Sequence, residues 1–293
     1  MVRILWLILF TACVLTAAAQ AEVKIQPDVV YGHKDGMALT FDVFTPEQPN
    51  GAGVLWLQSG GWYSGWREPE QMAAASRGFL DAGYTVFIVR HGSAPRFQVP
   101  DAIADVQRCV RFIRLHASDY GVFEDRLGVT GGSAGGHLTL MLATTGDDGN
   151  PEAKDRVLQH SSRIRCGVAL YPPTDLRGWT TDPPEEIKKH AGLKPPLSFA
   201  AELEASVSPV VHVTSDDAPV MLIHGDKDVL VPIEHSRNID PLLTEAKVPH
   251  ELIIVAGAGH GYSPEQNRDI VQPAMMRWFE THLLTPAKPE KRR

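Results

Sequence analysis

Apolar residues along this chain fall into two alternating patterns. Short continuous apolar runs have the length of buried strands, and the segments between them carry apolar residues every three or four positions, as amphipathic helices do. The predicted strands are, in chain order, GVLWLQSGG, YTVFIVR, RLGVTG, RCGVALY, APVMLIHG and HELIIVAG. The predicted helices cover residues 69–82, 99–116, 134–145, 233–246 and 264–284. Strands that alternate with helices indicate a parallel sheet.

The chain before these elements has a different pattern. The segment VVYGHKDGMALTFDVFTP reads as two strands joined by a turn at residues 34–36. Its position predicts an antiparallel hairpin at the start of the sheet. The fold class is therefore α/β, a mostly parallel, doubly wound sheet with an antiparallel N-terminal hairpin. No linker interrupts residues 22–285, so we expect one domain.

Three segments lie outside this alternation. Residues 145–164 are polar and loop-like, and the tail at 286–293 has a biased composition that predicts disorder. Residues 176–206 are rich in proline and charge, with Trp179 and Leu193 among the interspersed apolar residues. Insertions after strand ends in such sheets lie over the ligand crevice, which favours a small cap. A peripheral decoration is the alternative for this segment.

The first 21 residues have the features of a secretory signal peptide. Arg3 is followed by an apolar run over 4–19, with Ala19 and Ala21 at the predicted cleavage site. The run is shorter than the roughly 20 residues that a spanning helix needs, which disfavours a membrane anchor. Cys13 fits a lipoprotein site poorly. We expect export to the periplasm or beyond, and the signal does not separate the two.

Charge and cysteine content restrict the partners further. The chain has 28 basic and 35 acidic residues, a net charge of −7, and no basic run before its last residues. Nucleic acid and anionic membrane surfaces are therefore not expected partners. After the leader, Cys109 and Cys166 remain. An oxidising compartment permits a bridge, but their number and spacing favour two buried apolar side chains over a disulfide framework or a zinc site.

Between a predicted strand and helix, the chain places Ser133 in the sequence GGSAGG, with glycines on both sides. This arrangement allows the serine to occupy a strained turn that exposes its hydroxyl above the sheet edge. A serine hydroxyl needs a base to accept its proton, and the base needs an acid to orient it.

The residues for that base and acid follow later strands in the required order. Asp226 and Asp228 follow one strand, and His260 follows the last, in a glycine-flanked loop. Spacing alone does not choose between the two aspartates. The pair could also form a metal site with His224, but the sequence offers no further well-placed ligand, so we expect no metal. No cofactor is expected either.

An oxyanion hole requires backbone N–H donors near the nucleophile. The residue after the serine, Ala134, supplies one donor, and the loop QSGGWYSGW supplies Gly60 and Gly61. The aromatic residues of this loop are candidates to pack against a sugar or acyl group, with packing within the loop as the alternative; they are Trp62, Tyr63 and Trp66.

With these motifs in place, the chain resembles the α/β-hydrolase superfamily. Within it, the chain is similar to the esterase/lipase group that includes hormone-sensitive-lipase-like enzymes and bacterial feruloyl and acetyl-xylan esterases. The segments that carry the resemblance are GGSAGGHL, YPPTDL, HGDKDVLVP and GAGHGY. The resemblance implies the nucleophile Ser133, the base His260 and, from the pattern His-Gly-x-x-Asp-x-x-Val-Pro, the acid Asp228.

Two segments depart from the group. Where it usually has His-Gly-Gly, this chain has Gln58-Ser59-Gly60, and where it often has Asn-Tyr-Arg-Leu, this chain has residues 90–93, Arg-His-Gly-Ser. The hydrogen bonds that support the oxyanion loop must therefore differ.

The resemblance implies a secreted serine carboxylesterase acting on short-chain or aromatic acyl esters, with carbohydrate-linked acetyl or feruloyl esters as candidate substrates. The alternatives are a serine peptidase of the prolyl-oligopeptidase type and a non-catalytic binding protein on a hydrolase fold. The sequence does not indicate an oligomeric state.

Overall fold

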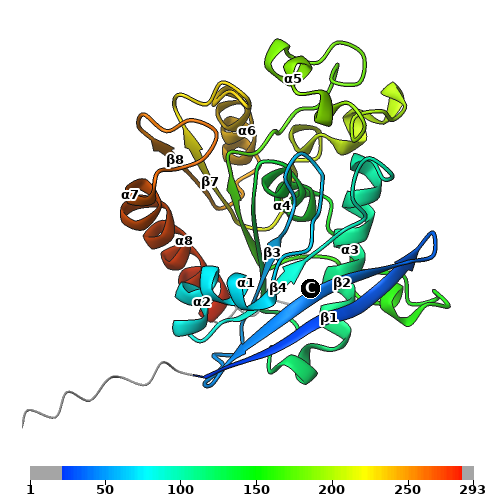
Figure 1. Ribbon diagram of the computed structural model, residues 1–293, viewed down its shortest axis with the longest axis vertical. Helices are drawn as coiled ribbons and strands as arrows, with labels where there is room; N and C mark the ends of the chain where they lie inside the picture. The colour runs from blue at the N-terminus through cyan, green and yellow to red at the C-terminus, as the bar shows by residue number, and fades with distance from the viewer. Residues whose placement is uncertain (1–21, 286–293) are drawn as a thin grey trace, which may run out of the picture.

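The computed structural model describes residues 22–285. The signal peptide predicted for 1–21 and the tail at 286–293 lie outside the described residues. Within these bounds, eight strands form one sheet in the order β1-β2-β4-β3-β5-β6-β7-β8 (Figure 1). The strands are β1 Val23–Lys34, β2 Met37–Pro46, β3 Gly53–Leu57, β4 Thr85–Val89, β5 Leu127–Gly132, β6 Cys166–Leu170, β7 Val220–Gly225 and β8 His250–Val255.

Strand direction confirms the predicted fold class. β1 pairs antiparallel with β2, and β2 pairs antiparallel with β4, whereas every pairing from β4 to β8 is parallel. The hairpin turn lies at Asp35 and Gly36, which both have positive φ, 49° and 78°. Two successive positive φ values give the turn type that matches the twist of a hairpin.

Helices cover both faces of the sheet (Figure 1). On one face, α3, α4 and α6 share an apolar core with the strands, and α1, α2 and α8 share a second core on the opposite face. The helices are α1 Pro69–Ala75, α2 Arg77–Asp81, α3 Val99–Leu115, α4 Ala134–Thr144, α5 Glu185–Lys189, α6 Glu234–Glu245, α7 Pro264–Gln266 and α8 Gln272–Phe279. No helix among residues 22–285 has the length and apolar content to cross a membrane.

One predicted helix is divided in the structure. The helix expected over 69–82 breaks at Ser76, whose hydroxyl donates to the carbonyl of Met72 at 2.8 Å. A serine whose hydroxyl donates to a carbonyl of the preceding turn bends its helix. The spacing of apolar residues does not reveal such a bend. Cys109 and Cys166 are free, buried thiols in the two different cores, as the simpler interpretation expected.

Candidate active site

Ser133 lies between the end of β5 and the start of α4, with φ 56° and ψ −119°. This conformation is strained for a residue with a side chain. The neighbouring glycines are required by contact: a Cβ on Gly131 would lie 2.6 Å from the backbone of Gly135, and one on Gly135 would lie 2.9 Å from the Leu57 carbonyl oxygen. The predicted elbow therefore needs glycine at both positions, because the backbone segments there lie too close together for a side chain.

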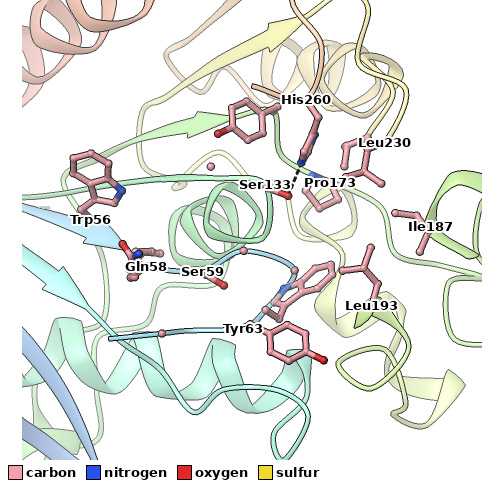
Figure 2. Close-up of a pocket in the computed structure, with 18 of the residues that line it drawn as sticks. Trp56, Gln58, Ser59, Tyr63, Ser133, Pro173, Ile187, Leu193, Leu230 and His260 are labelled. Carbon is pink, nitrogen blue, oxygen red and sulfur yellow. Dashed lines mark hydrogen bonds between the residues drawn. The ribbon is translucent and has the colours of Figure 1, made fainter. Parts of the chain in front are cut away.

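The structure brings the three predicted triad residues into one chain of hydrogen bonds. His260 Nδ1 lies 2.8 Å from Asp228 Oδ2, and His260 Nε2 lies 2.8 Å from Ser133 Oγ (Figure 2). Because a carboxylate only accepts, Nδ1 carries the proton and Nε2 is free to accept from the serine hydroxyl. The arrangement can move the hydroxyl proton to the imidazole during nucleophilic attack.

Asp228 is buried and held by several donors. Its Oδ1 accepts the N–H groups of Leu230 and Val231, at 3.0 and 2.9 Å. Burial alone would raise the pKa of this carboxyl, but the hydrogen bonds from His224, His260 and the Val231 N–H outweigh it and hold the pKa far below its usual range. The carboxylate therefore stays ionised and can stabilise a protonated His260.

The other candidate acid does not contact the histidine. Asp226 Oδ1 accepts the Gly257 N–H at 2.6 Å and stabilises the loop after β8. His224 lies beside Asp228, with its Nε2 3.3 Å from Asp228 Oδ2 and 2.8 Å from the Val231 carbonyl oxygen. It therefore packs against Asp228 and helps to keep that carboxylate ionised. The described residues contain no group of three ligands that could hold a metal ion.

The oxyanion loop differs from the prediction at one of three donors. Gly60 and Tyr63 exchange two backbone hydrogen bonds, each 3.0 Å, across a turn in which Gly61 and Trp62 have φ 56° and 59°. The prediction for Gly60 is therefore wrong in this structure, because its N–H donates within the turn. Gly61 and Ala134, whose N–H groups have no partner among residues 22–285, remain as the candidate donor pair.

Two features that depart from the resembling group meet beneath this loop. The Ser59 hydroxyl lies 2.8 Å from His91 Nε2, and His91 Nδ1 lies 2.8 Å from the Gly92 carbonyl oxygen. A carbonyl only accepts, so Nδ1 donates to Gly92 and Nε2 accepts from Ser59. Burial lowers the pKa of His91 to about 4, which keeps the ring neutral and this tautomer in place. No motif in the sequence indicates this pairing.

The three aromatic candidates have different positions. Trp62 is buried, and its indole N–H donates to His137 Nδ1 of α4 at 3.2 Å, so packing against the body of the protein accounts for most of its surface. Tyr63 lines a cleft that opens at Ser133, whereas Trp66 is 54% exposed and does not line it.

The cleft at Ser133, here called the Ser133 cleft, has a volume of about 570 Å³. Figure 2 shows Trp56 and Gln58 at one end and Ile187, Leu193 and Leu230 at the other, with Ser133 between them. From the sequence, Leu193 is only part of a possible cap. The structure places it against Gly61, where an added Cβ would lie 2.5 Å from Leu193 Cδ2. The remaining residues that line it are Leu57, Ser59, Gly60, Gly61, Trp62, Tyr63, Gly65, Arg67, Gly132, Tyr171, Pro173, Trp179, Val231 and His260.

Comparison with known proteins agrees with this fold. The model of the BD-FAE family matches residues 41–243. Among solved structures, a truncated carbohydrate esterase from gut microbiota has a TM-score of 0.75 at 22% identity, over 92% of this chain and 99% of that one. At this identity the likeness shows the fold alone.

Two curated relatives cover most of the chain. A probable carboxylic ester hydrolase, LipM of Mycobacterium tuberculosis, is 28% identical over 66% of this chain and 45% of its own length. Ethyl acetate hydrolase of Pseudomonas putida is 26% identical over 78% of this chain and 73% of its own length. The chain spans about half the length of LipM and of two further esterases of that organism. The resemblance to the α/β-hydrolase superfamily is confirmed, and the chain belongs to the BD-FAE family.

Proposed function

We propose that this BD-FAE family member is an exported serine carboxylesterase. The observation that carries the proposal is the continuous hydrogen-bonded chain from Asp228 through His260 to Ser133, which ends in an open cleft. Two backbone donors, on Gly61 and Ala134, flank the serine without partners among the described residues. The names of the relatives LipM and ethyl acetate hydrolase support the same reaction class.

The reaction takes place in two halves. Ser133 Oγ attacks the ester carbonyl carbon while His260 Nε2 takes its proton, and the N–H groups of Gly61 and Ala134 stabilise the oxyanion. His260 then gives this proton to the leaving alcohol oxygen as the C–O bond breaks, leaving an acyl-serine. In the second half, His260 takes a proton from water, the resulting hydroxide attacks the acyl carbon, and Ser133 regains its proton as the acid leaves.

The shape of the Ser133 cleft supports a small acyl group and a polar alcohol. The apolar side chains of Ile187, Leu193 and Leu230 form one end, which suits a short aliphatic or an aromatic acyl group. The opposite end carries the Trp56 indole and the Gln58 amide, which suit a hydroxylated alcohol such as a sugar. Acetyl and feruloyl esters of carbohydrates combine these two properties.

The test compares ester hydrolysis by the full-length chain, purified after expression, with that by Ser133→Ala. The substrates are p-nitrophenyl acetate, methyl ferulate, acetylated xylan and an aminoacyl p-nitroanilide. Loss of the nucleophile is expected to lower kcat by at least about 10³-fold. Ser118→Ala is the matched control, because Ser118 is exposed and its hydroxyl has no partner among the described residues.

Equal ester hydrolysis by Ser133→Ala and the unaltered chain would overturn the proposal. Faster cleavage of the anilide than of every ester would assign the chain to the peptidases. Export is tested separately, by N-terminal sequencing of the protein recovered from periplasm and medium. A start at Glu22 is expected, and an intact Met1 in the cytoplasm would contradict export.

A further inference from the structure

We propose that Arg67 binds a carboxylate on the alcohol portion of the ester, so that esters of acidic alcohols are the preferred substrates. This inference rests on the proposed function and deepens it. Three observations support it: Arg67 has no partner among the described residues, the cleft contains no acidic residue among them, and the loop before Arg67 returns to Gln58.

Arg67 differs from nearly all other arginines in residues 22–285. Those arginines pair with carboxylates, with backbone carbonyls or, at Arg126, with the ring of Phe123. In this part of the chain, only Arg67 and Arg156 have neither a hydrogen bond, an ion pair nor a ring contact. Arg67 is exposed, so its guanidinium can exchange water for a ligand.

The charge of the Ser133 cleft favours an anion at this position. The chain as a whole is acidic, with a net charge of −7, yet no aspartate or glutamate among the described residues lines the cleft. Within residues 22–285, Arg67 is the one lining side chain that carries a permanent charge. A guanidinium presents paired N–H donors that match the two oxygens of a carboxylate.

Arg67 lines the cleft three residues after a loop segment that returns to Gln58. The Ser64 hydroxyl donates to the Gln58 carbonyl oxygen at 2.6 Å, which folds the loop back beside Gln58 just before Arg67. The side chains of Trp56 and Gln58 also lack hydrogen-bond partners among residues 22–285. Arg67, Trp56 and Gln58 thus all line the cleft with N–H donors that have no partner among the described residues, and the apolar end near Leu193 is left for the acyl group.

The experiment measures charge preference with matched esters. Phenyl acetate and 3-acetoxybenzoate have the same acyl group, and only the second carries a carboxylate on the leaving alcohol. The quantity compared is kcat/KM for 3-acetoxybenzoate divided by kcat/KM for phenyl acetate. We expect Arg67→Gln to lower this ratio about tenfold, as loss of a charge-assisted contact does, and Arg67→Lys to retain part of it.

A matched control and a salt series complete the design. Arg156→Gln removes the other unpaired arginine, which does not line the cleft, and should leave the ratio unchanged. Raising the NaCl concentration from 20 to 500 mM should lower the ratio for the unaltered enzyme, and much less for Arg67→Gln, because salt screens an exposed charge pair.

Three results would overturn the inference. The first is an unchanged ratio in Arg67→Gln, and the second is an equal fall in Arg156→Gln. The third concerns kcat/KM for p-nitrophenyl hemisuccinate divided by kcat/KM for p-nitrophenyl butyrate. If Arg67→Gln lowers this ratio more than it lowers the ratio for 3-acetoxybenzoate, the anion lies on the acyl side. If phenyl acetate hydrolysis depends on Ser133 while the ratio is unchanged, only this inference fails. If the unaltered chain hydrolyses neither ester, the proposed function fails with it.

Discussion

Replacing Asp228 with asparagine is expected to lower kcat by about 10⁴-fold in a protein that still folds. The two carboxylate oxygens of Asp228 have different partners. Oδ1 accepts two backbone N–H groups, from Leu230 and Val231, and Oδ2 accepts the His260 Nδ1–H. An amide offers one oxygen and one NH₂ group, so it cannot satisfy both sides.

The contacts determine which way the amide turns. With its NH₂ toward Leu230 and Val231, two donors would face two backbone donors that lie at 3.0 and 2.9 Å. With its NH₂ toward His260, the conflict is limited to His224 Nε2, which lies 3.3 Å from Oδ2 and already donates to a carbonyl oxygen at 2.8 Å. The second orientation is therefore favoured.

In that orientation the histidine carries the wrong proton. His260 Nδ1 accepts from the amide, so the neutral ring holds its proton on Nε2, facing Ser133, and cannot act as the base. A loss of about 10⁴-fold in kcat is typical of this exchange in serine hydrolases, and it corresponds to about 5 kcal/mol in activation free energy.

The assay is kcat for p-nitrophenyl acetate, with thermal unfolding measured on the same preparations. Asp226→Asn is the matched control, because it changes a neighbouring acid that bonds to Gly257 and not to His260. A folded Asp228→Asn protein with kcat within tenfold of the unaltered enzyme would refute the tautomer argument. A 10⁴-fold loss in Asp226→Asn alone would transfer the acid role to that residue.

Further expectations concern the cleft wall, a buried ion pair and buried histidines. Leu193 lines both the Ser133 cleft and an adjoining cavity of about 440 Å³, so Leu193→Ala should join the two spaces. We expect kcat/KM for p-nitrophenyl octanoate, relative to that for p-nitrophenyl acetate, to rise about tenfold. An unchanged preference for acyl chain length would contradict this. Arg90 binds both oxygens of the fully buried Asp42, so Arg90→Met leaves a buried carboxylate without its partner. Urea unfolding should show a free energy of unfolding lower by about 3–5 kcal/mol, whereas a decrease below about 1 kcal/mol would contradict this role of the pair. Burial lowers the pKa of His91 and of His137 to about 4, whereas the unfolded chain binds these protons near pH 6.5. The free energy of unfolding should therefore fall as pH decreases from about 6.5 to about 4, by up to about 3 kcal/mol for each ring, and a flat urea-unfolding profile over this range would exclude it.

The sheet and the order of the site residues could be predicted because local patterns carry them. Buried parallel strands are continuous apolar runs, and the elbow requires glycines around Ser133. The residues Asp228 and His260 follow strands that lie side by side as β7 and β8, so their loops meet at one sheet edge. A strand order that places successive strands next to each other converts sequence order into spatial proximity.

The oxyanion loop could not be predicted to the same detail, because its geometry depends on an uncommon backbone conformation. Trp62 has a positive φ, which a bulky residue rarely adopts, and the resulting turn uses the Gly60 N–H. The buried indole is held there by His137, a residue of α4 that is 75 positions away in the sequence. Motif reasoning names the donors of a loop, but the fold around the loop decides which of them stay free.

The two departures from the resembling esterases illustrate the same limit in a different way. Considered singly, Ser59 in the oxyanion loop and His91 after β4 each replace a residue that the group usually has, and each suggests lost support. In the structure they are one hydrogen bond of 2.8 Å between a hydroxyl and a neutral ring. The Ser59 carbonyl oxygen also accepts the Gly135 N–H at 3.2 Å, which ties the same residue to the helix that follows Ser133. His91 therefore supports, through Ser59, both the loop that carries Gly61 and the turn that carries Ser133. The two departures form one contact between the segments that follow β3 and β4, a relation that neither motif contains alone.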